Sequence, residues 1–138
     1  MRKHAIVPPF RALDPELGVA ESLLAQGNLA LNDVVALLPD EHAAARALNE
    51  LLAETGARPR LVDTGNAWRV VYVTPRAESG DVAVGAAGLA ELVTVGGWRR
   101  VKRCATCGQP FCDRTSGCTR KWCSVHRSHS EAPSARVD

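Results

Sequence analysis

Apolar and polar residues recur at helical spacing through much of the first half of the chain. Asp14-Pro15-Glu16 is typical of a helix start, because a capping side chain precedes Pro at the first helical position, and Gly27 would end this helix after Gln26. Asp40-Glu41 opens the clearest helical segment, which Gly56 ends. Its inward positions are Ala44, Leu48, Leu51, Leu52 and Thr55. The pattern therefore predicts two amphipathic helices.

Two further segments predict helices on weaker grounds. Asn32-Asp33 can cap a short helix over residues 34–38, and Ser79-Gly80-Asp81 can cap a longer one over residues 82–95. The longer segment contains two glycines, which weaken a helix unless they let another helix approach closely. These glycines are Gly85 and Gly88.

A β-hairpin is predicted between the helices. Arg60-Leu61-Val62 and the β-branched and aromatic run Trp68–Val73 flank the turn cluster Asp63-Thr64-Gly65-Asn66. Trp68, Val70 and Tyr72 would share one face of the second strand. Because a two-stranded ribbon is marginally stable alone, we expect one face to lie on the helices.

The break at Gly96-Gly97 divides the chain into parts of different composition. The length of 138 residues suits one domain with a small appendage, and 46% of the residues are apolar, which is enough for a core. We therefore expect an α+β fold: a mainly helical N-terminal domain with a β-hairpin over residues 1–96, a small treble-clef-like zinc finger over residues 97–129 and a flexible tail over residues 130–138.

The five cysteines all lie between residues 104 and 123, which indicates metal binding when no export signal is present. Cys104 and Cys107 are separated by two residues and followed by Gly108, so a tight turn can direct both sulfurs to one ion. Cys123 and His126 stand three residues apart and would share one face of a helical turn. These four residues are the predicted Zn²⁺ ligands, and residues 109–112 and 120–122 are expected to pair as a hairpin.

Several alternatives for this segment stay open. Cys118 could replace Cys123 or His126 as a ligand, and His129 could replace His126. Cys112 is interpreted as a buried filler. A redox pair of Cys112 and Cys118 is disfavoured by a reducing cytoplasm. Phe111 and Trp122 are expected to form the small core of the finger, whose folding energy would come mostly from the metal.

The net charge of +2 hides a segregation of charge along the chain. Residues 1–96 carry eight basic and twelve acidic side chains, whereas residues 97–129 carry eight basic side chains and one acidic residue, Asp113. Such a basic block favours a polyanionic partner. The candidate nucleic-acid-binding residues are Arg99, Arg100, Lys102, Arg103, Arg114, Arg120, Lys121 and Arg127.

The segment from Arg100 to Arg127 resembles the CGNR zinc finger found at the C-terminus of bacterial stress-induced transcriptional regulators. The shared residues are the run 99–103 before Cys104, Phe111 followed by Asp113-Arg114-Thr115-Ser116, and Thr119-Arg120-Lys121-Trp122-Cys123-Ser124. The family usually has four residues within each ligand pair, whereas both gaps here are two residues, and His126-Arg127-Ser128-His129 replaces the motif that names the family. The resemblance implies a DNA-binding transcriptional regulator.

Three classes of function are relevant to a chain with these features. The first is DNA binding by phosphate contacts from the basic finger, and the second is a protein-interaction module with a purely structural zinc. The third, an enzyme, is not expected, because four protein ligands leave zinc no position for water. The chain contains no apolar run of the ~20 residues that span a bilayer, so we expect a cytoplasmic protein without membrane contact. The N-terminal helices could also form a homodimer.

Overall fold

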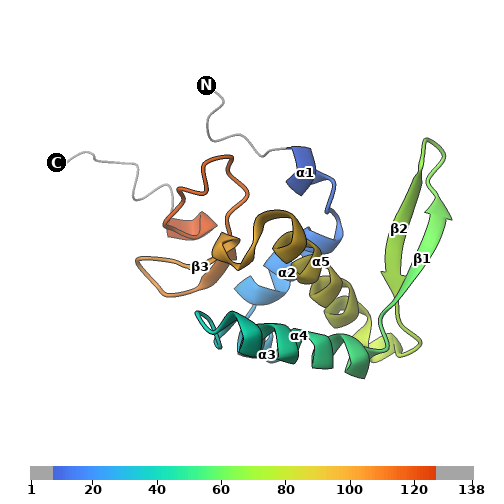
Figure 1. Cartoon of the computed structure of the whole chain (residues 1–138), viewed down its shortest axis with the longest axis horizontal. Coiled ribbons are helices and arrows are strands. Elements are labelled where there is room, and N and C mark those ends of the chain that lie inside the picture. The colour runs from blue at the N-terminus through green and yellow to red at the C-terminus, as the bar shows by residue number, and fades with distance from the viewer. Residues whose placement is uncertain (1–7, 127–138) are drawn as a thin grey trace.

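The structure is a computed structural model that describes residues 8–126, and its central element is the helix α5 (Gly80–Gly96). The helix α2 (Glu16–Ala25) packs closely along α5 (Figure 1). The two glycines of α5 make this approach possible, which is the alternative that the sequence left open for them. A Cβ atom on Gly88 would lie 2.3 Å from the backbone oxygen of Glu16, and one on Gly85 would lie 3.3 Å from the Cα of Ala20. Glycine thus sets the distance between these two helices.

Three more helices complete the helical part: α1 (Pro8–Arg11), α3 (Leu29–Val35) and α4 (Glu41–Thr55). Asp40 caps α4 by accepting a hydrogen bond from the backbone N–H of Ala43 at 3.1 Å, and Gly56 ends it with a positive φ of 70°. This helix is confirmed in type and extent. The leucines of the core that are fully buried are Leu17, Leu24, Leu31, Leu89 and Leu92.

The short second helix was predicted in the wrong place. It begins at Leu29 and not at Val34, because Asn28 caps it by accepting a hydrogen bond from the N–H of Leu31 at 3.1 Å. The predicted cap, Asn32, lies inside the helix and donates from its side chain to the carbonyl oxygen of Asn28 at 2.8 Å. Two asparagines with the same capping ability compete here, and the one that follows Gly27 begins the helix.

Two other predicted caps also differ from the structure. Pro15 occupies the N-cap position of α2, and Asp14 instead accepts a hydrogen bond from the N–H of Gly18 at 3.1 Å. Ser79 precedes α5 but its side chain makes no capping hydrogen bond, because a short 3₁₀ turn, η1 (Ala77–Ser79), leads directly into the helix. Both helices are nevertheless present over nearly the predicted residues.

The predicted hairpin is formed by β1 (Arg58–Asp63) and β2 (Trp68–Val73), which pair antiparallel with Leu61 opposite Val70. It extends away from the helices, at the opposite end of the helical part from the finger (Figure 1). Arg69 and Val71 lie on its half-buried face, and Arg69 forms an ion pair with Glu16. The face that carries Leu61, Trp68 and Val70 is exposed.

The finger begins with the 3₁₀ turn η2 (Trp98–Arg100), and its two strands are β3 (Val101–Arg103) and β4 (Pro110–Cys112). They pair antiparallel with each other, so the predicted pairing of residues 109–112 with residues 120–122 is wrong. Residues 120–122 lie outside any strand, because β3 supplies the backbone partners of β4. Val101 and Cys112 extend the hydrophobic core of the helices into the finger.

These elements confirm the α+β fold with its C-terminal cysteine and histidine cluster. The division into separate domains at residues 96 and 97 stays a prediction. None of the helices within residues 8–126 combines the length and apolar character needed to cross a membrane.

Candidate metal centre

The first ligand pair lies on a tight turn between β3 and β4. Cys104 follows β3 directly, and its backbone N–H donates to the carbonyl oxygen of Gln109 at 2.9 Å. The N–H of Gly108 donates to the carbonyl oxygen of Cys104 at 2.8 Å, and Gly108 has a φ of 75°. This positive φ confirms the tight turn that the glycine after Cys107 predicted. The turn therefore presents two sulfurs on one side.

The second pair lies on a helical turn at the end of the described chain. Cys123 precedes residues 124–126, which are helical, so His126 stands one turn further on. The backbone N–H of Ala105 donates to the carbonyl oxygen of Lys121 at 2.8 Å. This hydrogen bond joins the two segments and brings the ligand pairs together.

The ligand atoms of Cys104, Cys107, Cys123 and His126 all lie within 4.8 Å of one another. The sulfurs of Cys107 and Cys123 are 3.9 Å apart, and Nδ1 of His126 lies 3.6 Å from the sulfur of Cys104 and 3.3 Å from that of Cys123. Zn–S bonds of about 2.3 Å and Zn–N bonds of about 2.0–2.1 Å in a tetrahedron give S–S edges of about 3.8 Å and S–N edges of about 3.6 Å. The four residues are therefore placed closely enough to hold a metal ion.

The electrostatics of the cluster also suit a cation. Desolvation raises the pKa of Cys104, but hydrogen bonds from Cys123, Cys107 and Thr106 outweigh it and lower the pKa to about 5. The pKa of Cys123 is lowered despite desolvation, through hydrogen bonds from His126 and Val125. Two of the three thiols therefore favour the thiolate form in which cysteine binds metal.

Of the two alternative ligands, Cys118 lies apart from this cluster. Cys118 points its sulfur at the carbonyl oxygen of Arg99, 3.9 Å away, and does not belong to the group of ligand atoms within residues 8–126. Cys112 is 1% exposed, and burial raises its pKa to about 12, which confirms the interpretation as a buried filler. His129 lies outside the described residues.

The small core beneath the ligands is the predicted one. Phe111 is buried against Cys104 and Cys123, and Trp122 packs against them while remaining half-buried. The guanidinium of Arg120 stacks on the ring of Phe111 at 4.6 Å from its centroid, and its Nε donates to the carbonyl oxygen of Trp122 at 3.0 Å. A residue predicted to contact nucleic acid thus also covers this core.

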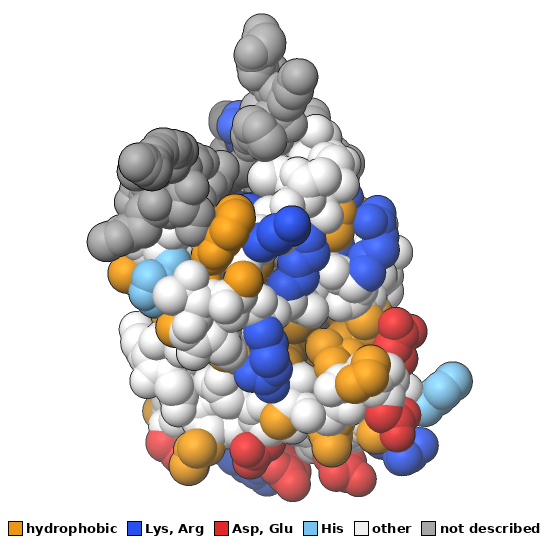
Figure 2. All heavy atoms as spheres, turned by 90° about the vertical axis from the view of Figure 1, so that its left-hand side faces the viewer, with side chains coloured by type: hydrophobic (Ala, Val, Ile, Leu, Met, Phe, Trp, Pro, Cys, Tyr) orange, Lys and Arg blue, Asp and Glu red, His pale blue; other side chains and the backbone are white. Residues whose placement is uncertain are grey.

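The seven basic candidates within residues 8–126 divide into two groups by exposure. Arg99, Arg103 and Lys121 are exposed. Figure 2 shows basic side chains over the middle of the finger side of the molecule, with acidic side chains gathered at its lower edge. Arg127 lies outside the described residues.

The second group is engaged inside the protein, and its centre is Asp113, which is fully buried. Lys102 donates to Oδ2 of Asp113 at 2.8 Å and to the carbonyl oxygens of Cys118 and Arg120, each at 2.8 Å. Oδ1 accepts from the backbone N–H of Thr115 at 2.9 Å and from its hydroxyl at 2.5 Å. Desolvation raises the pKa of Asp113, but these bonds outweigh it and lower the pKa to about 2.

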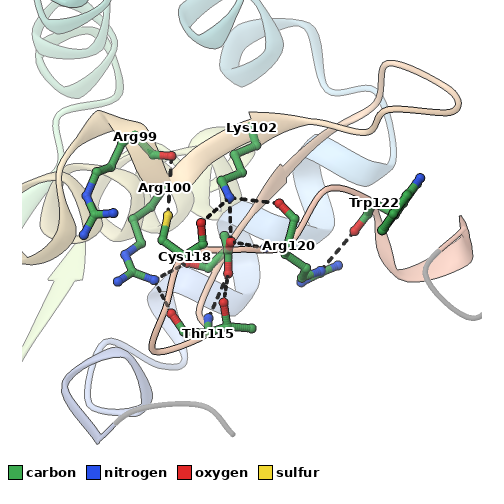
Figure 3. Close-up of polar contacts among 8 residues, drawn as sticks. Arg99, Arg100, Lys102, Thr115, Cys118, Arg120 and Trp122 are labelled. Atoms are coloured by element: carbon green, nitrogen blue, oxygen red, sulfur yellow. Dashed lines mark hydrogen bonds and ion pairs between the residues drawn. The ribbon is translucent and has the colours of Figure 1, made fainter. Parts of the chain in front are cut away.

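Arg100 is 5% exposed and fixes the same loop from its other side. Its guanidinium donates to the carbonyl oxygens of Asp113 and Thr115 (Figure 3). It also stacks on the ring of Phe10, 4.6 Å from the centroid. The residues of the loop therefore surround two cations with backbone carbonyls, and neither cation faces a partner in solution.

Arg114 connects the finger to α2. It donates to both carboxylate oxygens of Asp14, at 2.7 and 2.8 Å, and to both oxygens of Glu21, at 2.7 and 3.0 Å. The hydrogen bond to Arg114 lowers the pKa of Asp14, and the same contact raises that of Arg114. Sequence reasoning missed Phe10, Asp14 and Glu21 as partners of the finger, and only the excess of acidic residues in residues 1–96 hinted at such pairs.

An open cavity of about 540 Å³ lies between α2 and the metal centre. Its lining includes Cys107, Cys123 and His126 together with Phe111 and Val125. The candidate metal centre is therefore accessible from this side.

No model of a known protein family matches the chain, and no curated protein sequence matches it. The resemblance to the CGNR finger stays a prediction.

Proposed function

We propose that this chain is a zinc-binding, DNA-binding transcriptional regulator, in which zinc holds the finger in shape and the exposed basic residues contact phosphates. The observation that carries the proposal is the position of Arg99, Arg103 and Lys121. All three are exposed, and all three lie on two neighbouring segments of the finger beside the ligand turn.

The neighbouring segments are residues 99–103 and 118–121. The sulfur of Cys118 contacts the carbonyl oxygen of Arg99, Lys102 donates to the carbonyl oxygens of Cys118 and Arg120, and the N–H of Ala105 reaches Lys121. These contacts place the exposed cations on one small unit. A phosphate backbone carries one charge per ~1.7 Å of duplex, so a cluster of cations gains more from it than the same charges dispersed.

The metal has a structural role in this proposal. Four protein ligands complete a tetrahedron, and zinc bound in this way supplies folding energy rather than a reactive water. The proposal therefore assigns no catalytic step to the chain. Three phosphate contacts are few, so binding is weak and independent of base sequence unless residues beyond the described range add to it.

The test is retention on duplex DNA at a series of salt concentrations. Three contacts predict that the logarithm of the binding constant falls with the logarithm of salt with a slope of about −2.7. The triple variant Arg99→Gln, Arg103→Gln and Lys121→Gln should reduce this slope nearly to zero while its circular dichroism spectrum and zinc content stay unchanged.

A matched control removes the same charge elsewhere. Arg46→Gln, Arg58→Gln and Arg60→Gln replace three exposed cations of α4 and β1 and lower the net charge equally. This control should keep the slope of the wild type. Equal loss in both triple variants, or none in either, would contradict a finger-specific interface.

A second candidate is a protein-interaction module with structural zinc, and it is favoured by the exposed apolar face of the β-hairpin. Leu61, Trp68 and Val70 share this face and are 62%, 65% and 47% exposed. Neighbouring exposed apolar side chains are uncommon on the surface of a monomer and often mark a contact between proteins. This function would be favoured if the wild-type protein does not bind DNA but self-associates, and if Trp68→Ser makes it monomeric. Such a result would include a homodimer through the N-terminal part.

A further inference from the structure

The three thiols of the candidate metal centre differ in access to solvent. Cys104 is 4% exposed and Cys123 is 7% exposed, whereas Cys107 is exposed. Cys107 stands at the tip of the turn between β3 and β4, and both Cys107 and Cys123 line the open cavity beside α2. A small solute therefore reaches the sulfur of Cys107 first.

We propose that Cys107 is an oxidation site, at which hydrogen peroxide converts the zinc centre into a Cys107–Cys123 disulfide and releases the metal. This inference rests on the zinc centre of the proposed function and adds a mode of regulation to it.

The reaction proceeds in two balanced steps. The thiolate of Cys107 attacks one peroxide oxygen, the O–O bond breaks, and the sulfenic acid forms while the departing hydroxide takes a proton from a buffer acid, as does the hydroxide of the next step. The thiolate of Cys123 then attacks the sulfur of Cys107, a disulfide forms, and a second hydroxide leaves and is protonated. Two thiolates together lose two electrons, and one peroxide becomes two waters.

Cys123 is the resolving thiol in this proposal, and Cys104, whose sulfur also lies within 4.8 Å of that of Cys107, is the alternative that the disulfide map tests. The sulfur of Cys123 lies 3.9 Å from that of Cys107 and must approach to about 2.05 Å to form the bond. The two residues lie on separate segments, joined next to the site by the hydrogen bond between Ala105 and Lys121. Cys112 and Cys118 are poor competitors, because one is fully buried and the other is directed at the carbonyl oxygen of Arg99.

Disulfide formation has a direct consequence for the metal and for the finger. Only Cys104 and His126 would remain as ligands, and two ligands are too few for a structural zinc site. Cys123 also packs against Phe111, so its movement toward Cys107 disturbs the small core of the finger. Oxidation therefore lowers zinc content and the order of the finger together.

The test uses the full chain after purification with zinc. Zinc is measured first, hydrogen peroxide is added, and release is followed with a chromogenic chelator while disulfides are mapped after trypsin digestion. Cleavage after Arg103, Arg114, Lys121 and Arg127 would give the peptide 104–114, which holds Cys104, Cys107 and Cys112, and the peptide 122–127, which holds Cys123. Fragmentation of the linked pair in the mass spectrometer then identifies which of the three cysteines is joined to Cys123, and a bond from Cys104 or Cys112 would overturn the inference. We expect one zinc released per disulfide that joins these two peptides, and recovery of zinc binding after reduction by a dithiol.

Two variants make the assignment specific. Cys107→His keeps a zinc ligand at this position but removes the exposed thiol, and it should slow zinc release by about tenfold or more. Cys118→Ser removes a partly exposed thiol outside the cluster and should release zinc at the wild-type rate. If Cys107→His binds no zinc, the disulfide map of the wild type decides alone.

The outcomes separate this inference from the metal centre itself. A chain that never holds zinc overturns both. A zinc-loaded chain that keeps its metal in peroxide, or that forms a disulfide within the peptide 104–114, overturns the inference alone.

Discussion

In the helical part of this protein the fully buried side chains are mostly leucines, whereas the most deeply buried side chain of the finger loop is a carboxylate, Asp113. The helices gain stability from apolar area removed from water, at roughly 25 cal/mol per Å². The finger loop instead surrounds its cations and carboxylate with backbone partners and has only a small apolar core of its own, centred on Phe111.

The difference follows from size and composition. A segment of about thirty residues cannot bury enough apolar surface to offset its conformational entropy, so hydrogen-bonded ion pairs and, in our proposal, a metal supply the rest. A basic block in such a segment is then first a means of folding. Lys102, Arg100 and Arg114 show this, since each of them has its partners inside the protein.

The largest expected effect is removal of the metal. A zinc-binding free energy on the order of 10 kcal/mol is folding free energy for a small finger. A chelator should therefore abolish amide-exchange protection in residues 101–126 while most of the helical circular dichroism remains. Adding zinc, and not magnesium, should restore the protection. A complete loss of the helical circular dichroism signal would contradict this, because it would show that the helical part also depends on the metal for its folding.

The second effect tests the close packing of the helical part. Gly88→Ala would place a Cβ atom 2.3 Å from the backbone oxygen of Glu16 and force α2 and α5 apart, at a cost of about 3 kcal/mol in urea unfolding. Gly80→Ala in the same helix is the matched control, because nothing lies within 4 Å of its Cβ. The control should be neutral or stabilising by about 0.5 kcal/mol. Equal changes in unfolding free energy for both variants would contradict the proposal that Gly88 is needed for the close approach of α2 to α5.

The third effect tests the ionic interior of the finger. Asp113→Asn leaves Lys102 without its carboxylate and should destabilise by about 2 kcal/mol, less than a fully buried pair because Lys102 is 23% exposed. The folded pKa of about 2 lies below the reference value of 3.8, so Asp113 contributes stability above pH 3.8 that is lost as the pH falls through 2. The variant should lose less stability over this interval than the wild type.

Its control is Asp63→Asn, at the exposed turn of the hairpin, where Asp63 accepts a hydrogen bond from the N–H of Gly65 at 2.8 Å. Asparagine can accept the same bond, so stability near neutral pH should change by less than about 0.5 kcal/mol. Urea unfolding at pH 7 and at pH 3 measures both variants. A flat difference between wild type and Asp113→Asn across these pH values would contradict the charge argument.

The smallest effect concerns the exposed hairpin, which belongs to neither kind of interior. Trp68 is 65% exposed, so Trp68→Ser should change the unfolding free energy by no more than about 0.5 kcal/mol. A loss above 2 kcal/mol would mean that this face is covered in solution. Thermal unfolding of the variant at two protein concentrations distinguishes these outcomes.

Local features of the molecule were predictable from the sequence. The helix from Glu41 to Thr55, its cap at Asp40 and the close approach at Gly88 follow from spacing and residue type over short distances. The four clustered ligand residues were also predictable, because two short motifs determine their own local turns. The wrong start of α3 arose where Asn28 and Asn32 had equal capping ability.

The sequence by itself determined three of the helices, the hairpin of β1 and β2 and the four residues of the candidate metal centre, since each depends on neighbours a few positions away. Only the tertiary structure decided which basic residues face solvent, because their partners are remote: Arg114 meets Asp14 across a hundred positions of chain. It also decided that β4 pairs with β3. The carbonyl oxygens of Arg120 and Lys121 instead accept hydrogen bonds from the side chain of Lys102 and the backbone N–H of Ala105. The sequence therefore shows where the charges are, but whether a basic residue forms an internal ion pair or faces solvent depends on which opposite charges the fold brings near.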